Sequence, residues 1–184
     1  MLTRLFPNAL EPHAAAFNRQ QFRALAGMCE LDVLATIPWF PGAGLFSRWS
    51  AAGRWTGVPA DEVIDGLPVA HPRTLYLPRF GHGAASWLYA ASVVREVARR
   101  PSDVILGSWA YPDGAAAVDL GRVLGRPVVV KVHGSDLNVI ARLAGPERRL
   151  RAALPRARRR PGPGGRPDAR ARTPRRGRPR PSRA

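Results

Sequence analysis

Residues 103–132 constrain the fold more than any other part of the chain, because a strand, a helix and a second strand follow one another within 30 residues. The first strand is centred on Val-Ile-Leu, the helix runs to Leu124, and residues 128–132 form a valine-rich second strand. So short a crossover joins two parallel strands in a right-handed sense. The valine run is typical of a strand that is covered on both faces. These residues therefore predict an α/β protein with a parallel sheet.

Apolar residues recur at helical or strand-like spacing elsewhere in the first 154 residues as well. From these patterns we expect a short strand over residues 1–6, a helix over 13–26, a strand over 30–37, a helix over 84–100 and a helix over 137–153. The alternation of strands and helices predicts a Rossmann-like, doubly wound and mainly parallel sheet.

Two stretches in the first half of the chain show no regular period. Residues 38–66 hold Trp39, Trp49 and Trp55 among several glycines, and we expect an irregular loop with at most one helical turn. Tryptophans in such a loop either stack on sugar rings or cover the edge of the sheet, and covering is the favoured interpretation. Residues 67–77 are interrupted by two prolines, which predicts a single edge strand.

The composition changes abruptly after Leu154. Residues 155–184 contain 12 arginines and one acid, Asp168, and so carry +11 of the formal net charge of +16. They contain no aliphatic residue larger than alanine apart from proline and no aromatic residue, so they cannot bury enough apolar surface to order themselves. Codons for Arg, Pro, Gly and Ala can be built from G and C alone. We therefore predict one globular domain over residues 1–154 and a disordered tail over 155–184 that is read out of frame.

The basic tail leaves a second interpretation open. A non-enzymatic protein could bind nucleic acid or an anionic surface through these arginines, with strong salt dependence. The tail has no aromatic residue for stacking on bases, so no specific nucleic acid is expected. The single cysteine, Cys29, excludes an intramolecular disulfide, and no apolar stretch reaches the roughly 20 residues of a spanning helix. A cytoplasmic location is expected.

Several common chemistries lack their motifs. No G-x-G-x-x-G follows the first strand, and no G-x-x-x-x-G-K-[ST] loop occurs, so dinucleotide-binding and phosphate-loop enzymes are disfavoured. The histidines are scattered and only one cysteine is present, which predicts no metal site. His13, His71 and His82 are interpreted as surface or loop residues.

His133 is the candidate catalytic residue, because it stands at the carboxyl end of the valine-rich strand. In open α/β sheets ligands bind in the crevice outside those strand ends, and a histidine there can exchange protons near neutral pH. Gly134, Ser135 and Asp136 then turn the chain toward the next helix. Asp136 and Asp113 each precede a helix, and capping of that helix accounts for either residue without a ligand.

Three motifs, in order and on the expected elements, resemble a known family. They are Phe6-Pro7-Asn8, Tyr111-Pro112-Asp113-Gly114 and the run from Val130 to Asp136. Together they are similar to the N-terminal domain of family 4 glycosyltransferases of the GT-B fold, over about residues 5–153. The resemblance implies one half of a GT-B fold, the acceptor-side half.

The resemblance also implies an activity and roles for individual residues. It implies retaining transfer of a sugar from a nucleotide-diphosphate donor to a glycan or lipid-linked acceptor, without a metal or other cofactor. It implies that His133 lies near the reacting sugar and that Gly134 allows close approach of the backbone. The substrate-binding residues it implies are Asn8, Asp113, Gly134, Ser135 and Asp136.

The chain departs from the family in two places. Ala14-Ala15-Ala16 stands where glycine often begins the first helix. The donor-binding domain should begin soon after Leu154, where the arginine-rich tail stands instead, so we expect a truncated or frameshifted chain with little or no transferase activity. Peripheral association with the inner face of a membrane is expected from the same resemblance.

Overall fold

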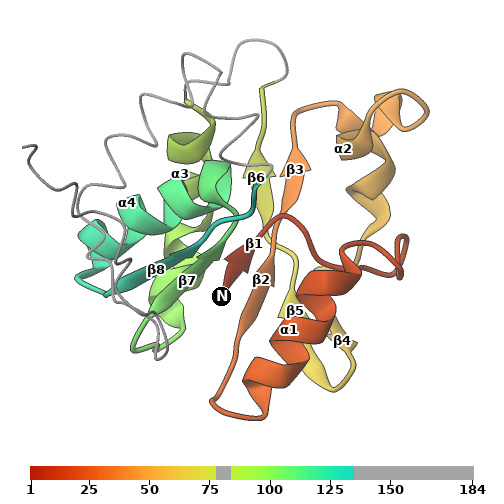
Figure 1. The fold of residues 1–184 in the computed structure, drawn as a ribbon. Coiled ribbons are helices and arrows are strands. Elements are labelled where there is room, and N and C mark those ends of the chain that lie inside the picture. Colours follow the sequence, from red (N-terminus) through yellow and green to blue (C-terminus); the bar gives the residue numbers. More distant parts are fainter. Residues whose placement is uncertain (78–83, 135–184) are drawn as a thin grey trace, which may run out of the picture.

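The computed structural model describes residues 1–77 and 84–134 (Figure 1). The expected helix over 137–153, the tail over 155–184, Ser135, Asp136 and His82 lie outside these described residues.

A six-stranded sheet forms the centre of the described domain, in the order β4-β5-β2-β1-β7-β8 (Figure 1). Its strands are β1 (Leu2–Thr3), β2 (Val33–Ala35), β4 (Asp61–Ile64), β5 (Leu67–Ala70), β7 (Ile105–Ser108) and β8 (Val128–Lys131). Every pairing is parallel except that of β4 with β5. The chain starts near the middle and winds outward in both directions, so the expected doubly wound, mainly parallel α/β sheet is confirmed.

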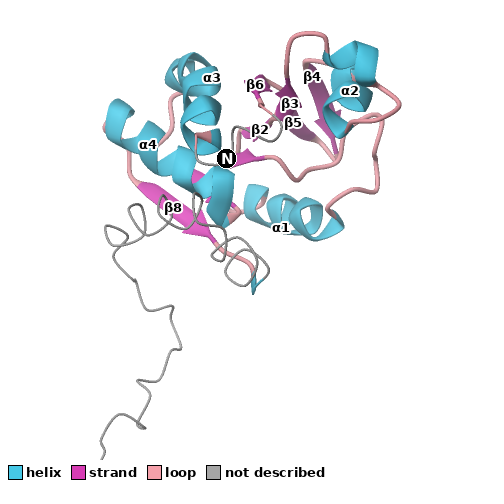
Figure 2. Ribbon diagram, turned by 90° about the horizontal axis from the view of Figure 1, so that it is seen from above, coloured by secondary structure: helices cyan, strands magenta, loops and turns pink. Residues whose placement is uncertain are grey.

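Three helices cover the sheet: α1 (Ala16–Ala26) lies on one face, and α3 (Ala85–Arg99) and α4 (Ala115–Leu124) lie on the other (Figure 2). Strand β2 shows how the alternation of side chains builds both cores. Val33 and Ala35 pack with Phe22 of α1, whereas Leu34 packs with Tyr89 of α3. Because successive strand residues point to opposite faces, a continuous apolar run is what a strand covered on both sides requires.

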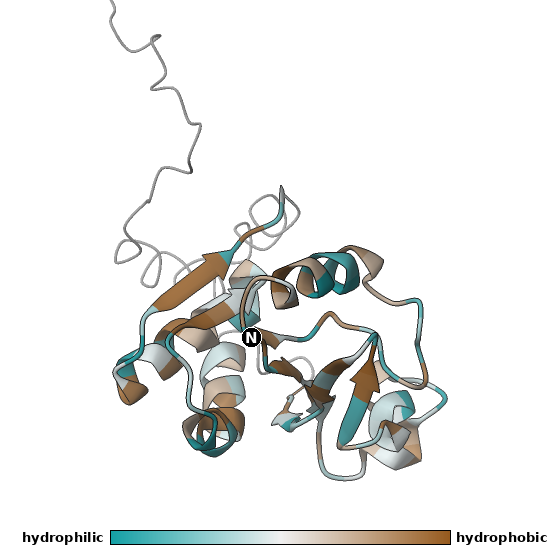
Figure 3. Cartoon of the chain, turned by 90° about the horizontal axis from the view of Figure 1, so that it is seen from below, coloured by the Kyte–Doolittle hydropathy of each residue, from teal (hydrophilic) through white to brown (hydrophobic). Residues whose placement is uncertain are grey.

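Helix α4 lies unusually close to β7 and β8. A Cβ atom added at Gly121 would lie 2.2 Å from Val128 Cγ2, and one added at Gly114 would lie 2.5 Å from Val130 Cγ1. A Cβ atom added at the strand residue Gly107 would lie 2.9 Å from Gly114 Cα. These three glycines, which lack a side chain, therefore let α4 pack close to the strands. The neighbouring strand β8 is hydrophobic and is coloured brown in Figure 3.

The expectations for residues 38–66 and 67–77 were wrong in part. Residues 61–64 and 67–70 form a hairpin, in which β4 is the edge strand and β5 is internal. Asp65 and Gly66 have φ angles of 53° and 79°, as a two-residue type I′ turn requires. An Asp-Gly pair between apolar residues is the usual sequence signal for such a turn, so this hairpin was predictable.

A second, two-stranded sheet and three short helices occupy the rest of this region. Strand β3 (Ile37–Trp39) pairs in parallel with β6 (Arg73–Leu75). Between β3 and β4 lie a 3-10 turn η1 (Ala43–Phe46), α2 (Ala51–Arg54) and a second 3-10 turn η2 (Trp55–Gly57). We call residues 40–57 the excursion.

Candidate functional site

Buried polar side chains gather at the carboxyl end of the parallel strands. Within the described residues the buried polar side chains are Thr3, Asn8, Asn18, Thr36, His71, Thr74, Ser86, Ser108 and Asp113. Apart from Thr74, which lies within β6, each ends or follows a sheet strand or stands in the first turn of α1 or α3. Buried polar groups need partners and therefore fix local geometry. Several of these side chains bond to backbone groups of the loops at this edge.

A pocket of about 90 Å³ opens at this edge, and we call it the site pocket. The loop after β1 forms one wall, with Arg4 and Asn8, and the ends of β2 and β5 contribute Thr36 and His71. Trp55 of η2 completes the lining. Trp55 thus lies at the carboxyl edge of the sheet, as part of this lining.

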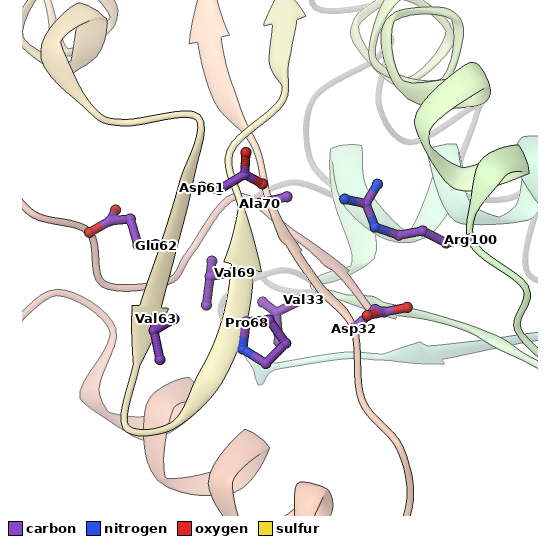
Figure 4. A pocket seen from close by; sticks show the side chains of 9 residues that line it. All are labelled: Asp32, Val33, Asp61, Glu62, Val63, Pro68, Val69, Ala70 and Arg100. Carbon is purple, nitrogen blue, oxygen red and sulfur yellow. The ribbon is translucent and has the colours of Figure 1, made fainter.

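A larger hollow of about 410 Å³ lies elsewhere, on the α3 face of the sheet beside β4 and β5 (Figure 4). Its charged lining includes Asp32, Asp61 and Arg100, and Arg100 is paired with Glu96. None of the buried polar residues lines this hollow, so volume alone does not identify the site. The described ranges also contain no cluster of three or more His, Cys, Asp or Glu residues able to hold a metal ion.

His71 is buried, which corrects its interpretation as a surface residue. Its Nδ1 lies 2.8 Å from the Ala35 carbonyl oxygen and its Nε2 lies 2.7 Å from Glu62 Oε1. Each ring nitrogen therefore faces an oxygen atom. The same Glu62 oxygen accepts a hydrogen bond from the Ala9 N–H at 3.2 Å. His71 and Glu62 thus tie the β1–α1 loop to the hairpin beside the pocket.

Asp113 does not cap α4, as had been expected. A turn of π-helix, η3 (Ala110–Gly114), precedes α4, and the residue at the N-cap position of α4 is Gly114, which has no side chain to cap it. The Asp113 side chain is 1% exposed and its Oδ2 accepts the Arg4 N–H at 2.9 Å. The backbone just before this turn is strained, since Trp109 has a φ of 114°. Asp113 therefore acts on the site pocket by holding the β1–α1 loop against the loop after β7.

Tyr89 contacts Thr36, one of the residues that line the site pocket. The Thr36 hydroxyl donates to the Tyr89 hydroxyl at 2.9 Å. Burial raises the pKa of Tyr89 well above 10.0, and the charge of Asp113 raises this pKa further. The phenol of Tyr89 is therefore held protonated in the folded protein.

We expect Tyr89 to make the protein less stable in alkaline solution. Its folded-state pKa is raised, so the stability is intact below about pH 10 and falls as the pH rises further, because only the unfolded chain then loses the proton. Tyr89→Phe should flatten this fall in the free energy of unfolding, measured by urea titration from pH 8 to 11. Thr36→Val removes the same hydrogen bond but keeps the phenol and should retain the steep fall; equal slopes in Tyr89→Phe and the parent would contradict the assignment.

Asn8 and Ala15 shape the loop that leads from β1 into α1. Asn8 Oδ1 accepts the N–H groups of Leu10 and Glu11, each at 3.0 Å, and so braces the loop. Ala15 precedes α1 with φ 48° and ψ 45°, a left-handed conformation. Glycine adopts this conformation without strain, whereas alanine meets a cost of about 1 kcal/mol. The loop thus has the shape that a glycine at this position would favour, although the residue is alanine.

His133 lies beyond the end of β8, in contact with two aromatic rings. Its ring centroid is 4.9 Å from that of Trp109 and 5.2 Å from that of Phe17, the latter edge to face. Nearby, Lys131 Nζ donates to Asn18 Oδ1 at 3.0 Å and to Gln21. We call His133, Trp109, Phe17 and Lys131 the His133 cluster.

Asn18 connects the strands behind this cluster, and sequence reasoning had missed it. Its Nδ2 donates to the Leu5 carbonyl at 2.6 Å, and its Oδ1 accepts from Ser108 at 3.2 Å as well as from Lys131. The side chain is completely buried. An asparagine four residues before the core residue Phe22 was the available signal, since both lie on one helical face.

The start of α1 separates the site pocket from the His133 cluster. Ala14 and Ala15 line the pocket, whereas Phe17 belongs to the cluster and Asn18 accepts a hydrogen bond from its Lys131. Of the predicted site residues, Asn8 lines the pocket, Asp113 supports it, and His133 and Gly134 lie on the other side of this helix end. Ser135 and Asp136 are outside the described part of the chain.

Comparison with known proteins gives one informative similarity. The chain is 25% identical over 146 residues to the "Putative teichuronic acid biosynthesis glycosyltransferase TuaC" of Bacillus subtilis (strain 168). The alignment takes in 75% of this chain and 36% of that protein, so the chain spans little more than a third of TuaC. No family model matches the chain, and no solved structure matches it. The similarity is therefore weak and concerns only part of TuaC.

Proposed function

We propose that the chain is the acceptor-side domain of a retaining, GT-B-type glycosyltransferase of family 4. It would transfer a sugar from a nucleotide-diphosphate donor to a glycan or lipid-linked acceptor. The similarity to TuaC carries this proposal. Support comes from the polar carboxyl edge of the sheet, which is where ligands bind in doubly wound folds.

In this proposal the site pocket receives part of the acceptor. The indole N–H of Trp55 is buried and has no hydrogen-bond partner among the described residues. A buried donor without a partner is costly, and a sugar hydroxyl in the pocket would satisfy it. The indole ring also offers an apolar face to a sugar ring. Trp55 is therefore the pocket residue that we expect to contact the acceptor.

His133 is the proposed catalytic residue. Its ring contacts those of Trp109 and Phe17, and it lies beyond Lys131, the last residue of β8. A positioned imidazole can accept or share a proton with a reacting hydroxyl. Lys131, two residues before His133, places a cation beside the Phe17 ring, where it would favour negative charge on a substrate.

Gly134→Ala tests the proposed approach of substrate to the backbone. A Cβ atom added at Gly134 would meet nothing within 4 Å, so stability should change by less than about 0.5 kcal/mol. If the sugar approaches this backbone, the added methyl group should weaken its binding about tenfold or more, as a loss of near 1.4 kcal/mol implies. The measurement is an NMR titration with methyl glycosides of common hexoses, hexosamines and hexuronates, compared with a urea titration of the same variant.

The titration also tests the site itself. Shifts should concentrate at the site pocket and the His133 cluster, and unchanged binding by Gly134→Ala would argue against close approach. Absence of shifts with every glycoside would argue against an acceptor site. Residues 1–184 alone should transfer sugar from nucleotide donors negligibly, and turnover at ordinary rates of about 1 s⁻¹ or more would contradict the acceptor-side assignment.

A further inference from the structure

Asn18 connects the two parts of the candidate site, the site pocket and the His133 cluster. It is carried by α1, which, like the other helices in the described ranges, is not long and apolar enough to cross a membrane. Its Nδ2 donates to the carbonyl of Leu5, which lines the pocket, and its Oδ1 accepts from Lys131 of the cluster. Oδ1 also accepts from Ser108, so the three partners follow or end the neighbouring strands β1, β7 and β8 (Figure 1). One completely buried side chain therefore ties three adjacent strand ends together.

The partners of Asn18 require an amide group at this position. The carbonyl of Leu5 can only accept and the ammonium group of Lys131 can only donate, so the side chain between them must offer a donor at one end and an acceptor at the other. Ionised aspartate has the same shape but no donor for Leu5, and leucine has neither group. A buried partner that loses its hydrogen bond is left unsatisfied, at a cost. The identity of residue 18 is therefore fixed by more than helix packing.

Lys131 supports both aromatic rings of the His133 cluster. Its Nζ lies 5.6 Å from the centroid of the Phe17 ring, and its main-chain carbonyl accepts the Trp109 N–H at 2.9 Å. The ring of His133 contacts both of these rings. Lys131 is also the only lysine in a chain with 28 arginines. A compact ammonium group can donate to Asn18 while it faces Phe17, whereas a guanidinium group is planar and its donors form a rigid fork.

We propose that Asn18 is a positioning residue for His133, because it fixes the His133 cluster relative to the site pocket. On the pocket side it holds the β1–α1 loop through Leu5. On the cluster side it holds Lys131, which supports the rings around His133. This inference rests on the proposed function, in which the pocket and His133 serve the same reaction. A sugar that orders the pocket loop therefore also affects the His133 ring, and this coupling is reciprocal.

The cluster side is tested in the full chain without any ligand. The ring-proton NMR signals of His133 are identified by their loss in His133→Gln. They report the position of the imidazole, because the ring currents of Trp109 and Phe17 displace them from their random-coil values. Lys131→Met keeps a long unbranched side chain but removes the ammonium group. The His133 ring signals should therefore move toward their random-coil values in this variant.

The pocket side is tested with Asn18→Asp, which keeps the acceptor oxygen but cannot donate to Leu5. The Leu5 carbonyl belongs to the same peptide group as the Phe6 N–H, so the Phe6 amide signal should shift. The ring signals of His133 should stay near those of the parent, because the acceptor for Lys131 remains. The matched control is the variant that removes only the serine hydroxyl bonded to Asn18, Ser108→Ala, and it should change both signals much less.

Binding of methyl glycosides tests the coupling between the two sides. In the parent, a glycoside that shifts the indole N–H signal of Trp55 in the pocket should also shift the His133 ring signals. In Asn18→Asp the loosened loop should weaken binding about tenfold, and in Lys131→Met the affinity should stay within about twofold of the parent. At saturating glycoside, both variants should lose most of the shift at His133.

Three results would overturn the proposal. They are unchanged His133 ring signals in Lys131→Met, an unchanged Phe6 amide signal in Asn18→Asp, and a glycoside-induced shift at His133 that is the same in Asn18→Asp as in the parent. The first two need no sugar, so they decide the role of Asn18 even if no glycoside binds the parent and the proposed acceptor site fails. Dispersed amide signals from α3 verify that each variant folds. If Asn18→Asp does not fold, the signals of Lys131→Met decide alone.

Discussion

Asp113→Ser should lower the free energy of unfolding by about 3 kcal/mol, the cost of losing a charge-assisted hydrogen bond and stranding a buried partner. Asp113 Oδ2 accepts the Arg4 N–H across 109 positions of sequence, and the carboxylate is almost completely buried. Serine is too short to reach Arg4. The β1–α1 loop should therefore loosen from the loop after β7, and a urea titration followed by circular dichroism measures the loss.

Serine is the informative replacement because it distinguishes the hydrogen bond to Arg4 from capping of α4. If Asp113 simply capped α4, serine would replace it with little loss, since the two are equally good N-cap residues. Asp119→Ser, which removes a more exposed carboxylate paired with Arg122 on the same helix, should cost less than about 1 kcal/mol. A loss of under 0.5 kcal/mol in Asp113→Ser would restore the capping interpretation.

Gly121→Ala should destabilise the protein although alanine is the better helix former. Helix propensity alone predicts a gain of about 1 kcal/mol from this change. The new methyl group would lie 2.2 Å from Val128 Cγ2 and 2.8 Å from the Arg126 carbonyl oxygen. Valine can shift, but the carbonyl belongs to the turn that enters β8. Overpacking of this kind costs about 1–3 kcal/mol or more, so we expect a net loss of about 2 kcal/mol.

Gly44→Ala provides the comparison for Gly121→Ala. A Cβ atom at Gly44 would meet nothing within 4 Å, so its stability should change by less than about 0.5 kcal/mol. Both variants would be compared by thermal and urea unfolding. A stabilising effect of Gly121→Ala would show that α4 can move away from β8 without loss of packing.

Much of the fold followed from local pattern. The valines of residues 128–132 and the apolar periods of α3 and α4 predicted their elements and the winding of the sheet, because strand and helix periods are properties of neighbouring residues. The hairpin at Asp65-Gly66 also depends on neighbouring residues alone, because its Asp-Gly pair signals the turn. The position of His133 at the carboxyl end of β8 was also predictable, since a strand direction fixes which residue comes last.

The partners of the site residues could not be read from local pattern. His71 gave no sign that Glu62 and Ala35 would enclose its ring, and nothing near Asp113 indicated Arg4. These contacts depend on which strands become neighbours, and that order is decided by how all the apolar faces are buried together. The same holds for Leu45 and Trp49. Both are large apolar residues, and only the folded structure shows that they are exposed to solvent.

The sequence by itself determined the fold class, the direction of the strands and the place of His133 just after β8, because each depends on spacing along the chain. Only the tertiary structure decided which polar groups are buried, which loops they hold together and which apolar side chains face solvent. Burial and pairing are properties of residues that are distant in sequence, so they emerge only when the sheet order brings those residues into contact.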